Sequence, residues 1–194
     1  MATIIQKKRF DNEKKLLLTE PLHYCTAYPD ENDPLIWYFI IYGQQDSHYY
    51  GGKFIGKITH SKKYPVEPPS YEMLTPNGRF EVKKEICLTN SRFHKGEWSS
   101  TWNIKTILIA FNSIFYADDT TGIAHILKTE EERKKFSIES DEYNKKNHAD
   151  IYEKFLTFTY LSHDVPTTQS VPPTQSVPPT QSVPTTQSVP IKTE

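Results

Sequence analysis

The clearest hydrophobic pattern in the chain starts after Asn103. From there, apolar side chains recur every three or four residues, at Ile104, Ile107, Leu108, Phe111, Ile114 and Phe115. This period places them on one side of an α-helix as a broad apolar stripe. Asn103 has a side chain that suits the N-cap of such a helix. We therefore predict a core helix that begins after Asn103 and packs its stripe against a sheet.

Four segments before this helix have the patterns of β-strands, at 23–28, 35–43, 53–60 and 71–74. The second, LIWYFIIYG, is β-branched and aromatic almost throughout, which favours a central strand buried on both faces. The connections between the four segments are short, whereas parallel neighbours would need long crossovers. The sequence therefore predicts a four-stranded antiparallel meander.

Three more helices are predicted around this sheet. Residues 4–18 contain no Gly or Pro and are rich in Lys, Glu and Leu, and Pro21 ends the helix. Two charged helices are predicted within 129–160, the first capped by Thr129 and followed by glutamates near its positive end. The predicted fold class is thus α+β. Residues 74–98 have little periodicity of either kind, and long irregular loops inside a compact domain are most often functional.

The end of the chain differs in composition from the rest. The motif TQSVP recurs every six residues from Thr168 to Thr186, with almost no large apolar side chains around it. Such a segment cannot bury enough apolar surface to fold, so we expect 163–194 to be a disordered Pro/Thr/Gln/Ser-rich tail. We therefore divide the chain into a folded core, 1–162, and this tail. The tail is interpreted as a spacer, and its hydroxyls leave a docking or modification segment as the alternative.

The net charge and the lack of long apolar runs restrict the class of protein further. The formal net charge is −1, which gives no electrostatic reason to expect a nucleic acid or an anionic membrane as partner. The N-terminal residues lack the apolar block of a signal peptide. No apolar run approaches the roughly 18 residues that cross a bilayer. We expect a soluble cytoplasmic protein with no membrane anchor, and access to the nucleus is left open.

Cys87 is the candidate for covalent chemistry. The chain has two cysteines, too few for a disulfide scaffold, and Cys87 lies in the irregular polar loop. A thiolate there can accept an acyl group and then offer it to an amine or a hydroxyl. No general base beside it is evident from the sequence, so a protease-like Cys–His pair is not expected. Cys25 lies in a strand pattern and is interpreted as a buried core residue. The alternative for Cys87 is the same buried, structural role.

Short motifs lie at characteristic places around Cys87. They are Gly51-Gly52, Tyr64-Pro65, Pro68-Pro69, Thr75-Pro76-Asn77-Gly78-Arg79-Phe80, Cys87-Leu88, Trp98, Trp102 and Thr120-Thr121-Gly122. Over about residues 4–160, this set resembles the ubiquitin-conjugating enzymes, most closely the branch that is usually tail-anchored in the endoplasmic reticulum membrane. The resemblance implies the ubiquitin-conjugating fold, with the same order of elements. It implies that Cys87 receives ubiquitin as a thioester from the activating enzyme, which uses the ATP, so no cofactor or metal is expected in this chain.

The resemblance also implies roles for other residues near Cys87. Asn77 corresponds to an asparagine that steadies the active loop or the developing oxyanion, although Thr75 stands where most members have histidine. Its alternative role is to stabilise a turn, because Asn-Gly forms turns on its own. His94 is a candidate acid or base, or a solvated loop residue. Asp118 and Asp119 stand where relatives hold an acidic residue that orients the incoming nucleophile.

A partner surface is implied in the same way. It combines the first helix, the proline-rich turn and the loop at Trp98, and its candidate residues are Lys7, Lys8, Arg9, Tyr64, Pro65, Val66, Trp98, Ser99 and Ser100. The three basic residues are otherwise interpreted as a solvated helix face. Val66 stands where many members carry phenylalanine, and Ser99-Ser100 replaces a common Ser-Pro or Asn-Pro, so the set of ligases accepted is expected to differ.

The expected function is transfer of ubiquitin, with a ubiquitin ligase, to a lysine of a protein substrate. The branch includes members that modify serine and threonine hydroxyls, so a hydroxyl acceptor is a second expectation. A catalytically silent variant of the fold that binds ubiquitin or a ligase is the first alternative. An unrelated α/β domain in which Cys87 is structural is the second.

Overall fold

The computed structural model describes residues 3–162 as helices packed around one antiparallel sheet. The elements are α1 (Ile4–Thr19), β1 (Cys25–Pro29), β2 (Ile36–Tyr42), β3 (Lys53–Thr59), β4 (Ser70–Met73), a 3₁₀ helix η1 (Arg92–Glu97), α2 (Ile104–Tyr116), α3 (Glu130–Asn147) and α4 (Ala149–Ser162). The predicted α+β class and element order are confirmed. The expected tail, 163–194, lies outside the described residues. None of the helices described within 3–162 is both long and apolar enough to cross a membrane.

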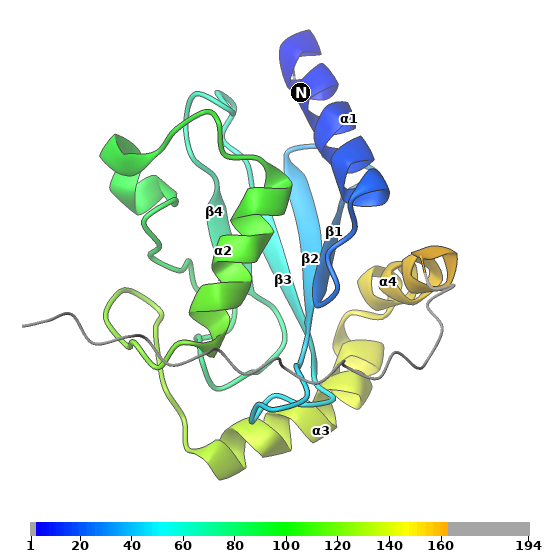
Figure 1. Cartoon of the computed structure of the whole chain (residues 1–194), viewed down its shortest axis with the longest axis vertical. Coiled ribbons are helices and arrows are strands. Elements are labelled where there is room, and N and C mark those ends of the chain that lie inside the picture. The colour runs from blue at the N-terminus through cyan, green and yellow to red at the C-terminus, as the bar shows by residue number, and fades with distance from the viewer. Residues whose placement is uncertain (1–2, 163–194) are drawn as a thin grey trace, which may run out of the picture. The chain divides into compact units, whose positions relative to one another are not determined.

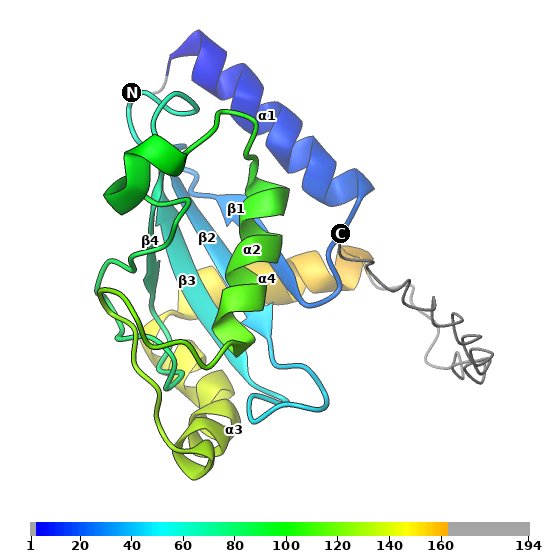
Figure 2. The same cartoon turned by 60° about the vertical axis from the view of Figure 1, so that its left-hand side comes forward.

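The sheet has the order β1-β2-β3-β4, with every neighbouring pair antiparallel, so the predicted meander is confirmed. Figures 1 and 2 show α2 across one face of the sheet and α4 across the other. Each face of the sheet carries a hydrophobic core. Strand β2 contributes to both of them, because successive side chains of a strand point to opposite faces. Trp37, Phe39 and Ile41 pack on the α2 side, whereas Ile40 packs with Phe155 of α4. Burial on both faces of β2 is therefore confirmed.

Helix α2 is the core helix that the apolar stripe predicts. Asn103 caps it by accepting a hydrogen bond from the Thr106 amide at 3.0 Å. Phe111, within the stripe, meets the Phe39 ring edge-on at 4.9 Å between centroids. Phe39 in turn lies over Gly56 of β3, where a Cβ atom would come within 2.1 Å of the ring. This glycine therefore lets the aromatic layer under α2 close against the sheet.

A buried carboxylate connects α1 to α2 and to the proline-rich turn. Glu13 is only 3% exposed, and its Oε1 accepts from the Tyr64 hydroxyl at 2.7 Å and from Arg9 Nε at 2.5 Å. Its Oε2 accepts from the Ile104 amide at 3.1 Å. That amide belongs to the first turn of α2, whose N–H groups have no partner within the helix. Glu13 thus fixes the positions of three separate segments.

The long loop after β4 is anchored at its start by a polar contact inside the domain. Thr75 Oγ1 accepts from the Ile55 amide of β3 at 3.0 Å and donates to Asn144 Oδ1 of α3 at 2.5 Å. The Asn144 side chain also donates to the Lys53 carbonyl at 2.7 Å. All buried polar atoms of this contact are paired, which a stable core requires. Thr75 therefore joins β3 and α3 at the point where the loop begins.

Candidate active site

Cys87 lies in the loop between β4 and α2, and its backbone is held from both sides. Its amide donates to the Ile123 carbonyl at 3.1 Å, and its carbonyl oxygen is 2.9 Å from His125 Nε2. The neighbours Ile86 and Leu88 are buried, whereas Cys87 is half-buried. The loop is therefore anchored by apolar side chains on either side of an accessible thiol.

Cys25 has the opposite environment. It is buried in β1, and burial raises the pKa of its thiol to about 12. A thiol held in its neutral form is a poor nucleophile, because the thiolate is the reactive species. Of the two cysteines, Cys87 is the one that a partner protein can reach.

The Cys87 thiol faces a pocket of about 310 Å³. The lining residues come from the loop, the end of α2 and the segment that follows it, and they are Cys87, Leu88, Thr89, His94, Ile114, Asp119, Thr121, Gly122 and His125. Three of the candidate catalytic residues, Cys87, His94 and Asp119, are therefore brought together. Within 3–162, no three His, Cys, Asp or Glu side chains are arranged to hold a metal ion.

His94 is placed directly beside the thiol. Its Nε2 lies 3.2 Å from Cys87 Sγ, and its Nδ1 lies 3.9 Å from a carboxylate oxygen of Glu97. The expectation that Cys87 has no paired histidine is therefore wrong, and the candidate role of His94 as acid or base stays a prediction. The chain folds back because Ser91 Oγ donates to the Leu88 carbonyl at 2.6 Å and caps η1. An imidazole at this distance can take a proton from the thiol or from an acceptor hydroxyl.

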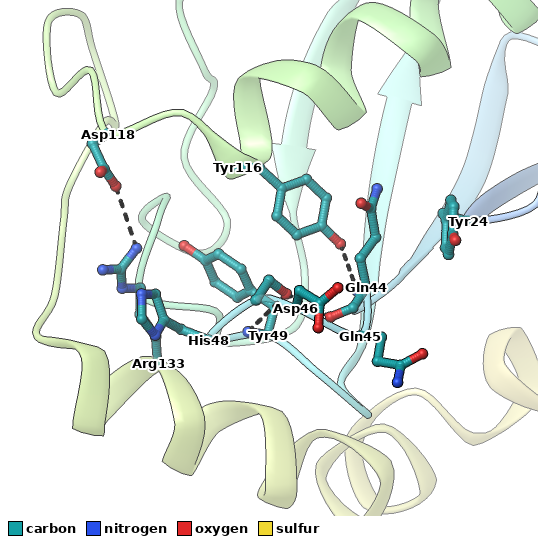
Figure 3. A pocket seen from close by; sticks show the side chains of 10 residues that line it. Tyr24, Gln44, Gln45, Asp46, His48, Tyr49, Tyr116, Asp118 and Arg133 are labelled. Atoms are coloured by element: carbon teal, nitrogen blue, oxygen red, sulfur yellow. Dashed lines mark hydrogen bonds and ion pairs between the residues drawn. The ribbon is translucent and has the colours of Figure 1, made fainter. Parts of the chain in front are cut away.

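Asp118 and Asp119, in the loop after α2, line different pockets. Asp119 lines the Cys87 pocket, and its Oδ1 accepts from the Thr121 amide at 2.8 Å and from the Thr121 hydroxyl at 2.7 Å. These two bonds lower the pKa of the Asp119 carboxyl. Asp118 instead pairs with Arg133 of α3, 3.5 Å from its Nη1, at a separate pocket of about 490 Å³ (Figure 3). Only Asp119 therefore lines the pocket of the cysteine.

Asn77 is completely buried inside the turn that precedes the cysteine. Its amide nitrogen donates to the Thr75 carbonyl at 2.9 Å, and its Oδ1 accepts from the amides of Arg79 and Phe80, each at 2.8 Å. These contacts support the turn-stabilising role, because every bond stays within the turn. The residues that line the Cys87 pocket do not include Asn77, and its catalytic role stays a prediction.

Arg79 and His125 are residues of the site that the sequence analysis does not single out as functional. Arg79 is fully buried, and its Nη2 donates to the Asp119 carbonyl. Its Nη1 lies 3.3 Å from Nδ1 of His125, whose other ring nitrogen meets Cys87. The only sequence signals are that Arg79 lies within the Thr-Pro-Asn-Gly-Arg-Phe motif and that a histidine follows Thr-Thr-Gly closely. Neither signal predicts that the two side chains meet.

The residues of the expected partner surface divide into outward and inward groups. Lys7, Lys8, Ser99 and Ser100 are exposed, and Val66 is 73% exposed. Arg9 and Tyr64 instead bond to buried Glu13, so their polar groups are engaged within the domain.

The proline-rich turn and the Trp98 loop are joined by two hydrogen bonds. The Pro65 carbonyl accepts from the Trp98 indole at 2.9 Å and from the Ser100 hydroxyl at 2.8 Å. The two segments therefore lie side by side, as a shared partner surface would require.

The family model and the similar proteins all belong to one family. A family model for ubiquitin-conjugating enzymes matches residues 9–149. The chain is 35% identical over 144 residues to the ubiquitin-conjugating enzyme E2 6 of Candida glabrata, which is 74% of this chain and 58% of that protein. It is 36% identical over 127 residues to the ubiquitin-conjugating enzyme E2 34 of Arabidopsis thaliana, covering 65% of this chain and 54% of the relative.

A third relative is the ubiquitin-conjugating enzyme E2 J2-like protein of Dictyostelium discoideum. It is 32% identical over 139 residues, which is 72% of this chain and 81% of that protein. The chain thus spans less than two thirds of the length of the Candida and Arabidopsis relatives. The matched region contains β1 to β4, the cysteine loop, α2 and α3. On these matches, the chain belongs to the ubiquitin-conjugating enzyme family.

Proposed function

We propose that the protein is a ubiquitin-conjugating enzyme that carries ubiquitin as a thioester on Cys87. The observation that carries this proposal is the accessible thiol of Cys87 in a pocket that also contains His94 and Asp119. Its partners are then ubiquitin, an activating enzyme, a ubiquitin ligase and a protein substrate. The chain needs no cofactor for this reaction, because the activating enzyme has already used ATP to activate the ubiquitin carboxyl group.

Charging is an exchange of one thioester for another. The Cys87 thiolate attacks the carbonyl carbon of the ubiquitin thioester on the activating enzyme, and a new bond forms from Sγ to that carbon. The bond to the sulfur of the activating enzyme breaks, and that sulfur leaves as a thiolate. His94 Nε2, 3.2 Å from Sγ, can accept the proton of the Cys87 thiol before the attack.

Discharge transfers the same acyl group to the substrate. A lysine amine attacks the thioester carbon, the bond to Cys87 Sγ breaks, and Sγ leaves as a thiolate. The amine must also lose a proton to a base near the reacting atoms. The Asp119 carboxylate lines the pocket, and the bonds from Thr121 that lower its pKa favour its ionised form. We assign to Asp119 the orientation of the lysine amine.

A charging assay tests the proposal. The protein is incubated with activating enzyme, ATP and ubiquitin, and the products are separated with and without a reducing agent. The expected result is an adduct of one ubiquitin that disappears on reduction. Absence of this adduct, with a known conjugating enzyme charged in parallel, would leave the silent binding protein as the better interpretation.

The position of His94 favours a hydroxyl acceptor in addition to lysine. A hydroxyl is a poorer nucleophile than an amine at neutral pH and depends more on a base next to the reaction centre. We expect the charged enzyme to discharge onto both free lysine and free serine. His94→Ala should slow discharge to serine about tenfold or more, with a smaller effect on lysine.

The measurement is single-turnover loss of the thioester after charging has been stopped. His23→Ala is the matched control, because His23 is exposed and is not among the residues that line the Cys87 pocket. If serine gives no discharge while lysine reacts readily, the hydroxyl interpretation fails. His94 would then be an exposed loop residue without this role.

The exposed partner surface provides the contacts to other proteins in this proposal. Lys7 and Lys8 carry the charge that attracts an acidic partner, which mainly raises the rate of encounter. Val66, Ser99 and Ser100 supply the exposed contact area between the proline-rich turn and the Trp98 loop. Arg9 and Tyr64 support this surface from within, through Glu13.

We also propose a cytoplasmic location, which the polar TQSVP repeat favours. A chain of this sequence, expressed without a tag, is expected in the supernatant after cell lysis and high-speed centrifugation. Recovery in the membrane pellet alone, resistant to extraction with salt, would contradict the proposal.

A further inference from the structure

His125 lies between Cys87 and the buried Arg79, and each of its two ring nitrogens contacts one of them. Its Nε2 is 2.9 Å from the Cys87 carbonyl oxygen, which can only accept, so this nitrogen carries the proton. Its Nδ1 is 3.3 Å from Arg79 Nη1, which can only donate, so this nitrogen presents its lone pair. The neutral ring with hydrogen on Nε2 satisfies these two neighbours at once. The Asp119 carbonyl oxygen, 3.5 Å from Nδ1, accepts from Arg79 Nη2 instead.

The same arginine holds the segment that carries Asp119. Arg79 Nη2 donates to the Asp119 carbonyl, and Nη1 is 3.4 Å from the Ile126 carbonyl. The guanidinium carbon lies 4.6 Å from the centre of the Phe80 ring, which His125 meets edge-on at 5.0 Å. The backbones of Cys87 and Asp119 are therefore connected through two packed side chains, Arg79 and His125.

The turn before His125 fits closely around its ring. Gly122 has φ +122°, a region that favours glycine. A Cβ atom there would lie 3.1 Å from Cδ2 of the His125 ring and 3.5 Å from the Cys87 carbonyl oxygen. The contact to the ring is tighter than most Cβ contacts, whereas the distance to the carbonyl oxygen is ordinary, so the close approach of the backbone is to the imidazole. This packing leaves the imidazole little freedom to leave the Cys87 carbonyl.

We propose that His125 is a positioning residue for acyl transfer, which with Arg79 sets the place of Cys87 relative to Asp119. The inference rests on the proposed function and adds a residue to its site. During discharge, the thioester carbon on Cys87 and the amine near Asp119 must meet in one geometry, and small displacements reduce such rates strongly. Charging depends first on access to the Cys87 thiol, so it is much less sensitive to this distance.

The test compares charging and single-turnover discharge to lysine in three variants. His125→Ala removes the donor to the Cys87 carbonyl and should charge like the wild type but discharge about tenfold more slowly. His125→Gln places an amide N–H near the position of Nε2 and should restore discharge to within about threefold of the wild-type rate. His23→Ala, at an exposed histidine, should match the wild type in both steps.

The difference between the two steps separates this role from a general effect on folding. A variant that failed to fold would lose both charging and discharge, whereas a displaced Cys87 should lose discharge alone.

Three results would overturn the inference. They are wild-type discharge by His125→Ala, equal slowing of discharge in the alanine and glutamine variants, and loss of charging together with discharge in His125→Ala. Failure of the wild-type protein to charge would instead count against the proposed function itself. The two kinds of failure are thus distinguished within one set of measurements.

Discussion

Replacement of Cys87 by alanine is expected to abolish the reducible ubiquitin adduct completely. Without Sγ there is no atom to form the thioester, and buried Cys25, with its raised pKa, cannot substitute for it. The fold should remain intact, because Cys87 is half-buried in a loop that its buried neighbours Ile86 and Leu88 anchor. The charging assay measures the first effect, and the melting temperature measures the second.

Two further variants complete this experiment. Cys87→Ser should form an oxyester with ubiquitin that resists the reducing agent, because an ester is less reactive toward thiols than a thioester. Cys25→Ala is the matched control and should retain charging. An alanine variant at position 87 that still gave a reducible adduct would disprove the assignment and direct attention to Cys25.

Replacement of Glu13 by alanine is expected to lower the free energy of unfolding by about 3 kcal/mol. The change leaves the buried Tyr64 hydroxyl and the Ile104 amide without their acceptor, and Arg9 without its carboxylate. Burial and the adjacent Glu13 raise the pKa of Tyr64, so the phenol stays a donor that needs a partner. Urea denaturation followed by fluorescence measures the loss.

The matched control for this prediction is Glu20→Ala. Glu20 pairs with Lys105 but is 60% exposed, so its loss should cost less than about 1 kcal/mol. If the two variants are equally stable, Glu13 does not anchor the first helix as its contacts indicate.

Much of the fold follows from patterns that are local in the sequence. The apolar stripe from Ile104 to Phe115 predicts α2, and the caps Asn103 and Thr129 are confirmed by their bonds to Thr106 and Glu132. The aromatic and β-branched segment of β2 predicts a central strand, and its neighbours predict the meander. Such features can be predicted because capping and side-chain periodicity depend on residues only a few positions apart.

The helix η1 has no comparable signal in the sequence. RFHKGE lacks an apolar period. Ser91 accepts from the Phe93 amide as the N-cap, and its hydroxyl also donates to the Leu88 carbonyl. Arg9 and Tyr64 are similarly expected on a partner surface, yet both bond inward to Glu13. Three segments far apart in the chain meet at that carboxylate, and no spacing rule predicts the meeting.

By itself, the sequence determined the class of fold and the order of its elements, and it singled out the cysteine that we propose carries the acyl group. Only the tertiary structure decided which side chains surround that cysteine. In the folded protein, His94 lies next to Cys87 Sγ, and His125 contacts the Cys87 carbonyl. Asp119 lines the pocket of the cysteine, whereas Asp118 pairs with Arg133. In helices and strands the backbone period sets the direction of each side chain. In the loops of this site the direction is set by contacts with distant segments, which exist only once the chain has folded.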